Sequence, residues 1–134
     1  MHDENDRVRF GIVLNTDKYD DILVNDESDL VRAEIAKHGH HLDKLINDRH
    51  WAVRQEVASH KYGLEKLIND EAPEVRQEVA KQGYGHDILV NDPDKYVRGE
   101  VASQGSYLDI LTHDKDEMVR YLAEEKLKEL EESK

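Results

Sequence analysis

The histidines are the residues of this chain whose types and spacing best suit metal chemistry. His38, His40 and His41 lie within four positions, and His60 repeats His38 22 residues later. Imidazole nitrogens are good zinc ligands. The chain has no cysteine and no pair of histidines four residues apart, and His38 and His60 on helices roughly 10 Å apart could not share an ion. We therefore favour polar turn residues over a metal site and expect no metal and no cofactor.

Carboxylates are the other abundant reactive groups, with 31 aspartates and glutamates. Each has a simpler assignment as a helix cap, an ion-pair partner or part of a solvated helix face. The sequence shows no nucleophile elbow, no phosphate-binding loop and no glycine-rich dinucleotide turn. We therefore expect the protein not to be an enzyme.

Aspartate and arginine recur six residues apart along the chain. An arginine stripe could grip an acidic partner, or the pairs could form a structural ladder of caps and ion pairs between repeats. The ladder is favoured because each arginine has an acid at fixed spacing and its planar fork suits bidentate pairing. The ladder residues are Asp26 and Arg32, Asp48 and Arg54, Asp70 and Arg76, Asp92 and Arg98, and Asp114 and Arg120.

These pairs belong to a repeat of 22 residues, in which each of the five arginines follows a valine. A period of this length is typical of a solenoid, in which each unit packs mainly on its neighbours. We expect one domain over residues 1–134, with a degenerate repeat at 1–16, regular repeats at 17–114 and a capping helix at 115–134. The predicted fold is all-α, with about five to six two-helix repeats.

One copy shows how the repeat should fold. Asp92 is the expected N-cap and Pro93 the first helical residue. Val97 and Val101 share one face of a three-turn helix, and Gly105 fits the left-handed position after its end. The segment 108–112 then forms a short turn of α or 3-10 helix.

The helix-ending glycine recurs at Gly39 and Gly83. Lys61 stands at this position in the third copy, where we expect the neighbouring Gly63 to take over. The last copy has no such glycine, and apolar residues at 119, 122, 123, 127 and 130 form one stripe of a longer helix. This pattern is typical of a cap that closes the core with a polar outer wall.

The unit Asp-x-x-x-x-Val-Arg-x-Glu-Val-Ala, followed by a short Leu-x-x-Leu turn, resembles the leucine-rich repeat variant family, bacterial relatives of HEAT repeats. The resemblance covers residues 17–123. It implies pairs of one long and one short helix, stacked in a right-handed superhelix, and aspartate–arginine bonds between neighbouring repeats. Family members often carry proline after the aspartate, which this chain keeps only at Pro93. The family consists of interaction scaffolds, so the resemblance implies a right-handed α-solenoid without a defined reaction.

Charge limits the partners. The net charge is −12, and residues 1–29 hold nine acids against three bases. Phosphate backbones are bound by lysine and arginine, so we expect no direct binding of nucleic acid. No run of about 18 apolar residues is present, so no membrane span is expected. The absence of cysteine fits a reducing compartment, and we expect a cytoplasmic protein.

The turn before each short helix varies while the surrounding residues hardly change. Such contrast is what a recognition surface would show, although tyrosines could also wedge between turns and stabilise the fold. Tyrosine is favoured at protein interfaces. The candidate partner-binding residues are Tyr19, His40, His41, Tyr62, Tyr84, His86 and Tyr107, with Lys44, Lys66 and Asp109 on the short helices.

The sequence favours a non-enzymatic module that binds a protein or peptide with a basic or mixed surface along one face. The alternative is a small acidic inhibitor, of the kind that phages encode, which mimics nucleic acid and blocks a basic protein. A third possibility is a piece of a longer array. Oligomeric state stays open, because the first repeat would leave an apolar end around Phe10, Ile12, Val13 and Leu14.

Overall fold

The computed structural model describes residues 20–134, and every regular element in that range is a helix. This confirms the expectation of an all-α protein. The chain divides into two compact units, residues 1–67 and 68–134, which we call the amino-terminal unit and the carboxyl-terminal unit. The degenerate repeat expected at residues 1–16 lies outside the described residues.

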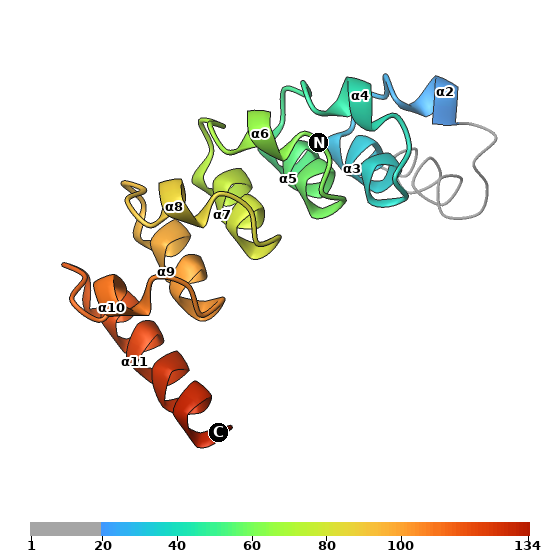
Figure 1. The fold of residues 1–134 in the computed structure, drawn as a ribbon. Coiled ribbons are helices and arrows are strands. Elements are labelled where there is room, and N and C mark those ends of the chain that lie inside the picture. Colours follow the sequence, from blue (N-terminus) through green and yellow to red (C-terminus); the bar gives the residue numbers. More distant parts are fainter. Residues whose placement is uncertain (1–19) are drawn as a thin grey trace. The chain divides into compact units, whose positions relative to one another are not determined.

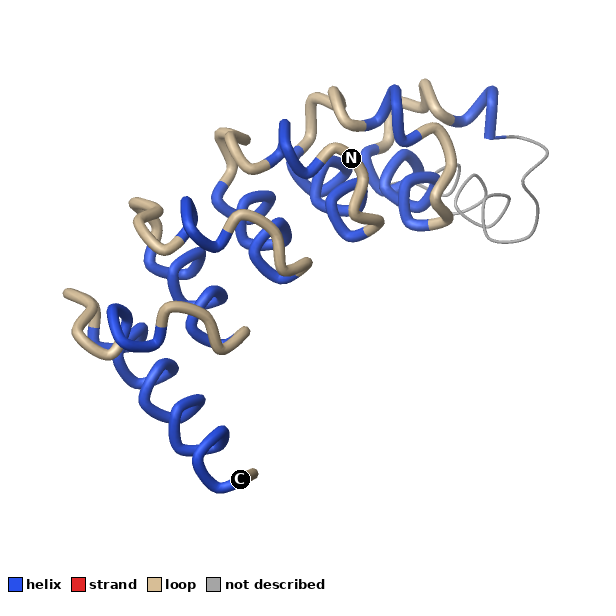
Figure 2. Tube along the Cα trace, in the orientation of Figure 1, coloured by secondary structure: helices blue, strands red, loops and turns tan. Residues whose placement is uncertain are grey.

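Long and short helices alternate within each unit (Figure 1; Figure 2 shows the connecting loops). The amino-terminal unit contains the nine-residue helices α3 (Asp29–Lys37) and α5 (Trp51–Ser59) and the four-residue helices α2 (Asp20–Leu23), α4 (Leu42–Leu45) and α6 (Leu64–Leu67). The carboxyl-terminal unit contains the nine-residue helices α7 (Pro73–Lys81) and α9 (Lys95–Ser103), the four-residue helices α8 (His86–Leu89) and α10 (Leu108–Leu111), and the 16-residue helix α11 (Glu117–Glu132).

Apolar residues at helical spacing build the core of both units. Helix α3 packs on α5, and α9 packs on both α7 and α11. Each long helix buries one face because its apolar residues are four apart. Fully buried are Val31 and Ile35, Val53 and Val57, Val75 and Val79, Val97 and Val101, and the alanines Ala36, Ala58, Ala80 and Ala102. The alanines are small enough for neighbouring helices to approach closely.

The short helices are held by tertiary packing, since a single helical turn is unstable alone. In the amino-terminal unit α4 contacts both α3 and α5, and in the carboxyl-terminal unit α10 contacts both α9 and α11. The last leucine of each of these turns points into the core. These leucines, Leu45, Leu67, Leu89 and Leu111, are buried, and each burial contributes about 1.5–3 kcal/mol.

The expected N-cap was placed two residues too early. Helix α9 begins at Lys95, and its cap is Asp94, whose carboxylate accepts the backbone N–H groups of Tyr96 and Val97 at 2.8 and 3.2 Å. The carboxylate of Asp92 is not available for capping, because it accepts the N–H of Asp94 in the preceding turn at 2.9 Å. Pro93 therefore lies in that turn and not in the helix.

The left-handed position after α5 is also filled differently from the prediction. Lys61 itself adopts it, with φ +58°, as Gly39, Gly83 and Gly105 do after the other long helices. Gly63 also has a left-handed conformation, with φ +63°, but it lies directly before α6 and does not end α5. A lysine in this conformation brings its Cβ too close to the backbone, at a cost of about 1–2 kcal/mol.

We therefore expect Lys61→Gly to stabilise the protein. Glycine removes the left-handed cost, and the greater freedom of glycine in the unfolded chain takes back about 0.5–1 kcal/mol, leaving a gain of about 0.5–1 kcal/mol. Urea unfolding of both proteins measures it. The matched control is Gly83→Lys, at φ +81° with no atom within 4 Å of an added Cβ, which should lose a similar amount. A destabilised Lys61→Gly protein would contradict this account.

Helix α11 differs from the other long helices in length and packing. Val119 and Ala123 are buried, whereas Leu127 and Leu130 in the later turns are partly exposed. Its side chains approach α9 closely, since a Cβ on Gly99 would lie 3.1 Å from Leu122 Cδ1. The apolar stripe of α11 is thus covered in its first half and open in its second.

Candidate interaction surface

Each buried arginine joins its own repeat to the next one. In the carboxyl-terminal unit, Nε and Nη2 of Arg98 donate to the Asp114 carboxylate at 2.9 and 3.1 Å, and Nη1 donates to the Asp92 carbonyl at 2.8 Å. Asp92 lies six residues before the arginine and Asp114 lies 16 residues after it. The carboxylate partner therefore comes from the following copy, and the acid six residues back contributes its backbone.

The same arrangement recurs in each unit. Arg76 pairs with Asp92 at 2.8 Å in the carboxyl-terminal unit, and Arg32 pairs with Asp48 at 2.7 Å in the amino-terminal unit. Arg54 and Arg120 likewise donate to the carbonyls of Asp48 and Asp114, each at 2.7 Å. Bidentate geometry of this kind needs the planar arginine fork, so lysine could not reproduce it.

The aspartates also accept a backbone hydrogen bond in the turn before each long helix. In every copy Oδ1 accepts the backbone N–H two residues further on, at 2.9 Å. The residues concerned are Asp26, Asp48, Asp70, Asp92 and Asp114. In Asp48, Asp92 and Asp114 one carboxylate serves both the turn and the arginine of the preceding copy, which fixes the register of one repeat on the next within each unit.

The ion pairs are reflected in the pKa values of the carboxyl-terminal unit. Hydrogen bonds from Arg76 to Asp92 and from Arg98 to Asp114 raise the pKa of both guanidinium groups, against the opposing effect of burial. For Asp114, burial raises the pKa, but the hydrogen bonds from Arg98 and from the Asp116 N–H, with the Arg98 charge, lower it overall. Arg98 and Asp114 therefore stabilise each other's charged forms.

Several histidine side chains make hydrogen bonds or ion pairs with nearby residues of the protein. His41 is the N-cap residue of α4, with φ +54°, and its Nε2 lies 2.9 Å from Asp21 Oδ1. His60 Nε2 lies 2.8 Å from the Lys37 carbonyl, which can only accept, so this nitrogen carries a proton. His38 pairs with Glu34 at 3.3 Å, and His40 lies in the turn before α4. Among residues 20–134 no group of three or more histidines and carboxylates is arranged to hold a metal ion.

His86 replaces a leucine that other copies carry at the start of the short helix. Its Nε2 donates to the Ala80 carbonyl at 2.8 Å, and its Nδ1 lies 2.7 Å from Ser106 Oγ. In the neutral ring the serine hydroxyl therefore donates to Nδ1. Both ring nitrogens therefore make hydrogen bonds within the carboxyl-terminal unit. His86 links the end of α7 to the turn before α10, and its nitrogens are not available to a partner protein.

The other partner-binding candidates are more exposed. Tyr62, Tyr84 and Tyr107 each keep about 40% of their surface open, in the turns before α6, α8 and α10. The short helices expose Lys44, Lys66 and Asp109. The Lys44 ammonium donates to Asn25 Oδ1, and that of Lys66 donates to Asn47 Oδ1. Tyr19 lies outside the described residues.

Exposed isoleucines on the short helices were missed by the sequence analysis. Ile22, Ile88 and Ile110 keep 71%, 58% and 51% of their surface open. Each is the third residue of its short helix, the place that Lys44 and Lys66 occupy in other copies. Two lysines at one repeat position indicate that it faces water, so the isoleucines there could have been recognised as exposed.

The variation in the turns is partly a packing effect. A Cβ on Gly63 would lie 2.2 Å from Ile46 Cδ1, and a Cβ on Gly85 would lie 2.2 Å from Ile68 Cδ1. Within residues 20–134 two copies have a side chain at this place, His41 and Tyr107, and they carry Val24 and Val90 instead of the isoleucine.

Valine lacks the Cδ1 atom that would collide, so these two positions change together. The residue displayed at the start of a short helix therefore depends on a buried residue 17 positions earlier. The sequence indicated a variable recognition surface in these turns. At the residue directly before each short helix, however, the variation follows the identity of a buried core residue.

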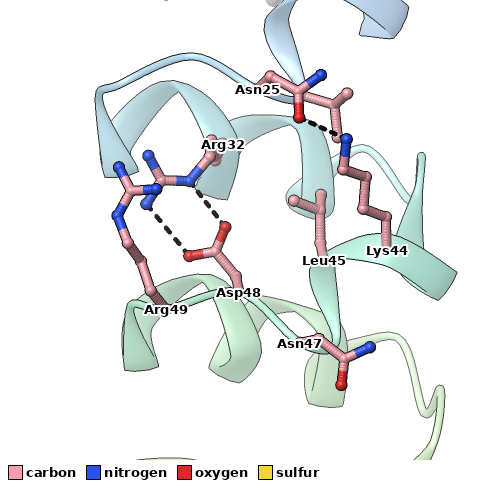
Figure 3. A pocket seen from close by; sticks show the side chains of 8 residues that line it. Asn25, Arg32, Lys44, Leu45, Asn47, Asp48 and Arg49 are labelled. Carbon is pink, nitrogen blue, oxygen red and sulfur yellow. Dashed lines mark hydrogen bonds and ion pairs between the residues drawn. The ribbon is translucent and has the colours of Figure 1, made fainter.

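A hollow of about 490 Å³ lies in the amino-terminal unit, between the loops that follow α2 and α4 (Figure 3). The buried side chain of Leu45 lies at its floor, the paired Arg32 and Asp48 at one side, and Lys44 and Arg49 at its rim. Arg49 Nη2 donates to the Glu27 carbonyl at 3.4 Å. The hollow thus combines an apolar floor with two exposed cations.

Comparisons of the chain with protein-family models, curated proteins and solved structures find no match. None of the helices in the described part of the chain has the length and hydropathy needed to cross a membrane.

Proposed function

We propose that the chain is a short, right-handed α-solenoid of the leucine-rich repeat variant type that binds a protein partner and catalyses no reaction. The support is the 22-residue step of the long helices and the arginine in each unit that pairs with the aspartate of the following copy. The family resemblance supports the right-handed stacking, and the absence of cysteine supports the cytoplasm.

The observation that carries the binding proposal is the exposed apolar group on the short-helix side of the carboxyl-terminal unit. Ile88 lies on α8 and Ile110 on α10. Tyr84 lies two residues before α8, and Tyr107 is the N-cap residue of α10. Aliphatic and aromatic side chains on a rigid helical scaffold lose little freedom when they are buried by a partner. This surface fits an apolar patch with a mixed polar rim.

Ile110→Lys is expected to weaken partner binding at least tenfold. Burying the exposed half of Ile110 contributes about 0.8–1.5 kcal/mol, the lysine ammonium adds the cost of placing a charge in an apolar contact, and each 1.4 kcal/mol is a factor of about ten in affinity. The partner is captured from the native host with the wild-type chain, identified by mass spectrometry and purified, and its affinity for both proteins is measured by calorimetry. The fold should tolerate the change because Lys44 and Lys66 occupy the same repeat position.

Ser103→Lys provides the matched control. It adds the same charge to the same unit, on α9, at the repeat position where α7 carries Lys81. It should leave the affinity unchanged. Equal affinities for the wild-type and Ile110→Lys proteins would contradict the proposed surface.

Salt separates this proposal from the acidic inhibitor. A nucleic-acid mimic should lose affinity steeply between low and high salt, because its contacts are between opposite charges. Binding through isoleucine and tyrosine should change little. The calorimetric comparison at two salt concentrations therefore tests both functions with the same proteins.

A further inference from the structure

We propose that the hollow of the amino-terminal unit binds a carboxylate side chain from an acidic peptide segment of the partner. The inference rests on the proposed function, since it gives the module a second contact, but it uses different residues. The hollow is open to water and has room for a short side chain. Its chemistry is set by Lys44 and Arg49 at the rim, which Figure 3 shows on opposite sides of Leu45.

The two rim cations are available to a ligand. Within residues 20–134 the bonds they make go to the Asn25 amide oxygen and the Glu27 carbonyl, and neither group lies in an ion pair. Both side chains are exposed. A guanidinium carries five N–H donors, so the long 3.4 Å bond to Glu27 leaves Arg49 able to grip a carboxylate with two parallel bonds.

The other charges at the hollow leave a net attraction for an anion. Arg32 and Asp48 neutralise each other through their bidentate pair, so Lys44 and Arg49 supply the attraction. Leu45 at the floor suits the methylene groups of a glutamate side chain.

The same two positions in other copies show that the fold does not require these cations. The pairs that correspond to Lys44 and Arg49 are Ile22 and Glu27, Lys66 and Glu71, Ile88 and Pro93, and Ile110 and Lys115. None of these four pairs combines two cations. The amino-terminal unit therefore concentrates positive charge at one place in a chain whose net charge is −12, as expected for a local contact with an acidic segment.

The test uses the full chain and two acetylated, amidated peptides, Gly-Leu-Glu-Leu-Gly and its glutamine counterpart. Titrations at low salt are followed by the backbone N–H signals of residues 44–49 and the Arg49 Nε–H signal in NMR spectra. The glutamate peptide should give saturable shifts confined to the hollow, and the glutamine peptide should bind at least tenfold more weakly. Arg49→Glu and Lys44→Ile should each weaken the glutamate peptide at least fivefold.

Lys115→Glu is the matched control, because it makes the same charge change as Arg49→Glu at the equivalent position of the carboxyl-terminal unit. It should leave the peptide affinity unchanged. Equal binding of the two peptides, tighter binding of inorganic phosphate at the same signals, or full affinity in Arg49→Glu would overturn the inference. Ile110→Lys should bind the glutamate peptide normally, so a failure here is distinct from a failure of the surface on α8 and α10.

Discussion

Gly63→Ala is expected to destabilise the amino-terminal unit by about 2 kcal/mol. An alanine at φ +63° pays the left-handed cost of about 1–2 kcal/mol, and its Cβ would lie 2.2 Å from Ile46 Cδ1. The buried isoleucine must then move, at a further cost of about 1 kcal/mol. Trp51, the single tryptophan, lies in this unit, so its fluorescence during urea unfolding reports the change directly.

The second part of this prediction is a rescue. Ile46→Val removes the colliding Cδ1 and alone costs about 0.5–1.5 kcal/mol. In the double variant the collision is gone, so the two losses should not add, and a favourable coupling of about 1 kcal/mol is expected. Gly83→Ala measures the effect of the left-handed conformation and of glycine's freedom in the unfolded chain without a collision, because open space surrounds its Cβ position. Strict additivity in the double variant would show that the two positions are not coupled.

The helices of this protein were predictable because every copy repeats the same pattern. Valines four residues apart and a glycine after the helix recur in most copies, so the same helix could be predicted in each of them. The cap was placed wrongly for a local reason. Asp92 and Asp94 both suit an N-cap, and only the structure shows that Asp92 is already used by the turn and by Arg76.

The candidate surface was less predictable, because exposure depends on contacts that a pattern does not record. The sequence offered His41 and His86 as partner contacts, yet the first lies against Asp21 and the second bridges Ala80 and Ser106. Ile88 is exposed, which only a comparison with Lys44 and Lys66 in other copies indicates in the sequence. The sequence shows valine in place of isoleucine 17 residues before His41 and Tyr107. The reason appears only in the structure, where an isoleucine Cδ1 would lie 2.2 Å from a Cβ at this place.

Arg98→Met is expected to cost about 3–5 kcal/mol, the largest effect of any single substitution considered for this chain. The Arg98 and Asp114 side chains are only 6% and 8% exposed, and removing one member of a buried pair leaves the other charge without compensation. Asp114 would keep its bond from the Asp116 N–H, which places the loss toward the lower end of this range. Thermal and urea unfolding at neutral pH measure it.

Acid should act in opposite directions on the wild-type and Arg98→Met proteins. In the wild type the pKa of Asp114 lies below its ordinary value of 3.8. The stability from its ionised form is therefore complete above about pH 4 and is lost as the pH falls through the folded pKa. In the variant, burial without the arginine should raise that pKa, so protonation relieves the unpaired charge and the variant regains the part of its stability that the Asp114 charge had removed.

The gap in unfolding free energy between the two proteins should therefore narrow as the pH falls from 6 toward 3. Asp114→Asn is the control, because it removes the titrating group and should flatten this part of its own pH profile. Arg98→Met combined with Asp114→Asn should be more stable than Arg98→Met alone, since the uncompensated charge is gone. A gap that stays constant over this range would mean that Asp114 is not the partner whose ionisation Arg98 stabilises.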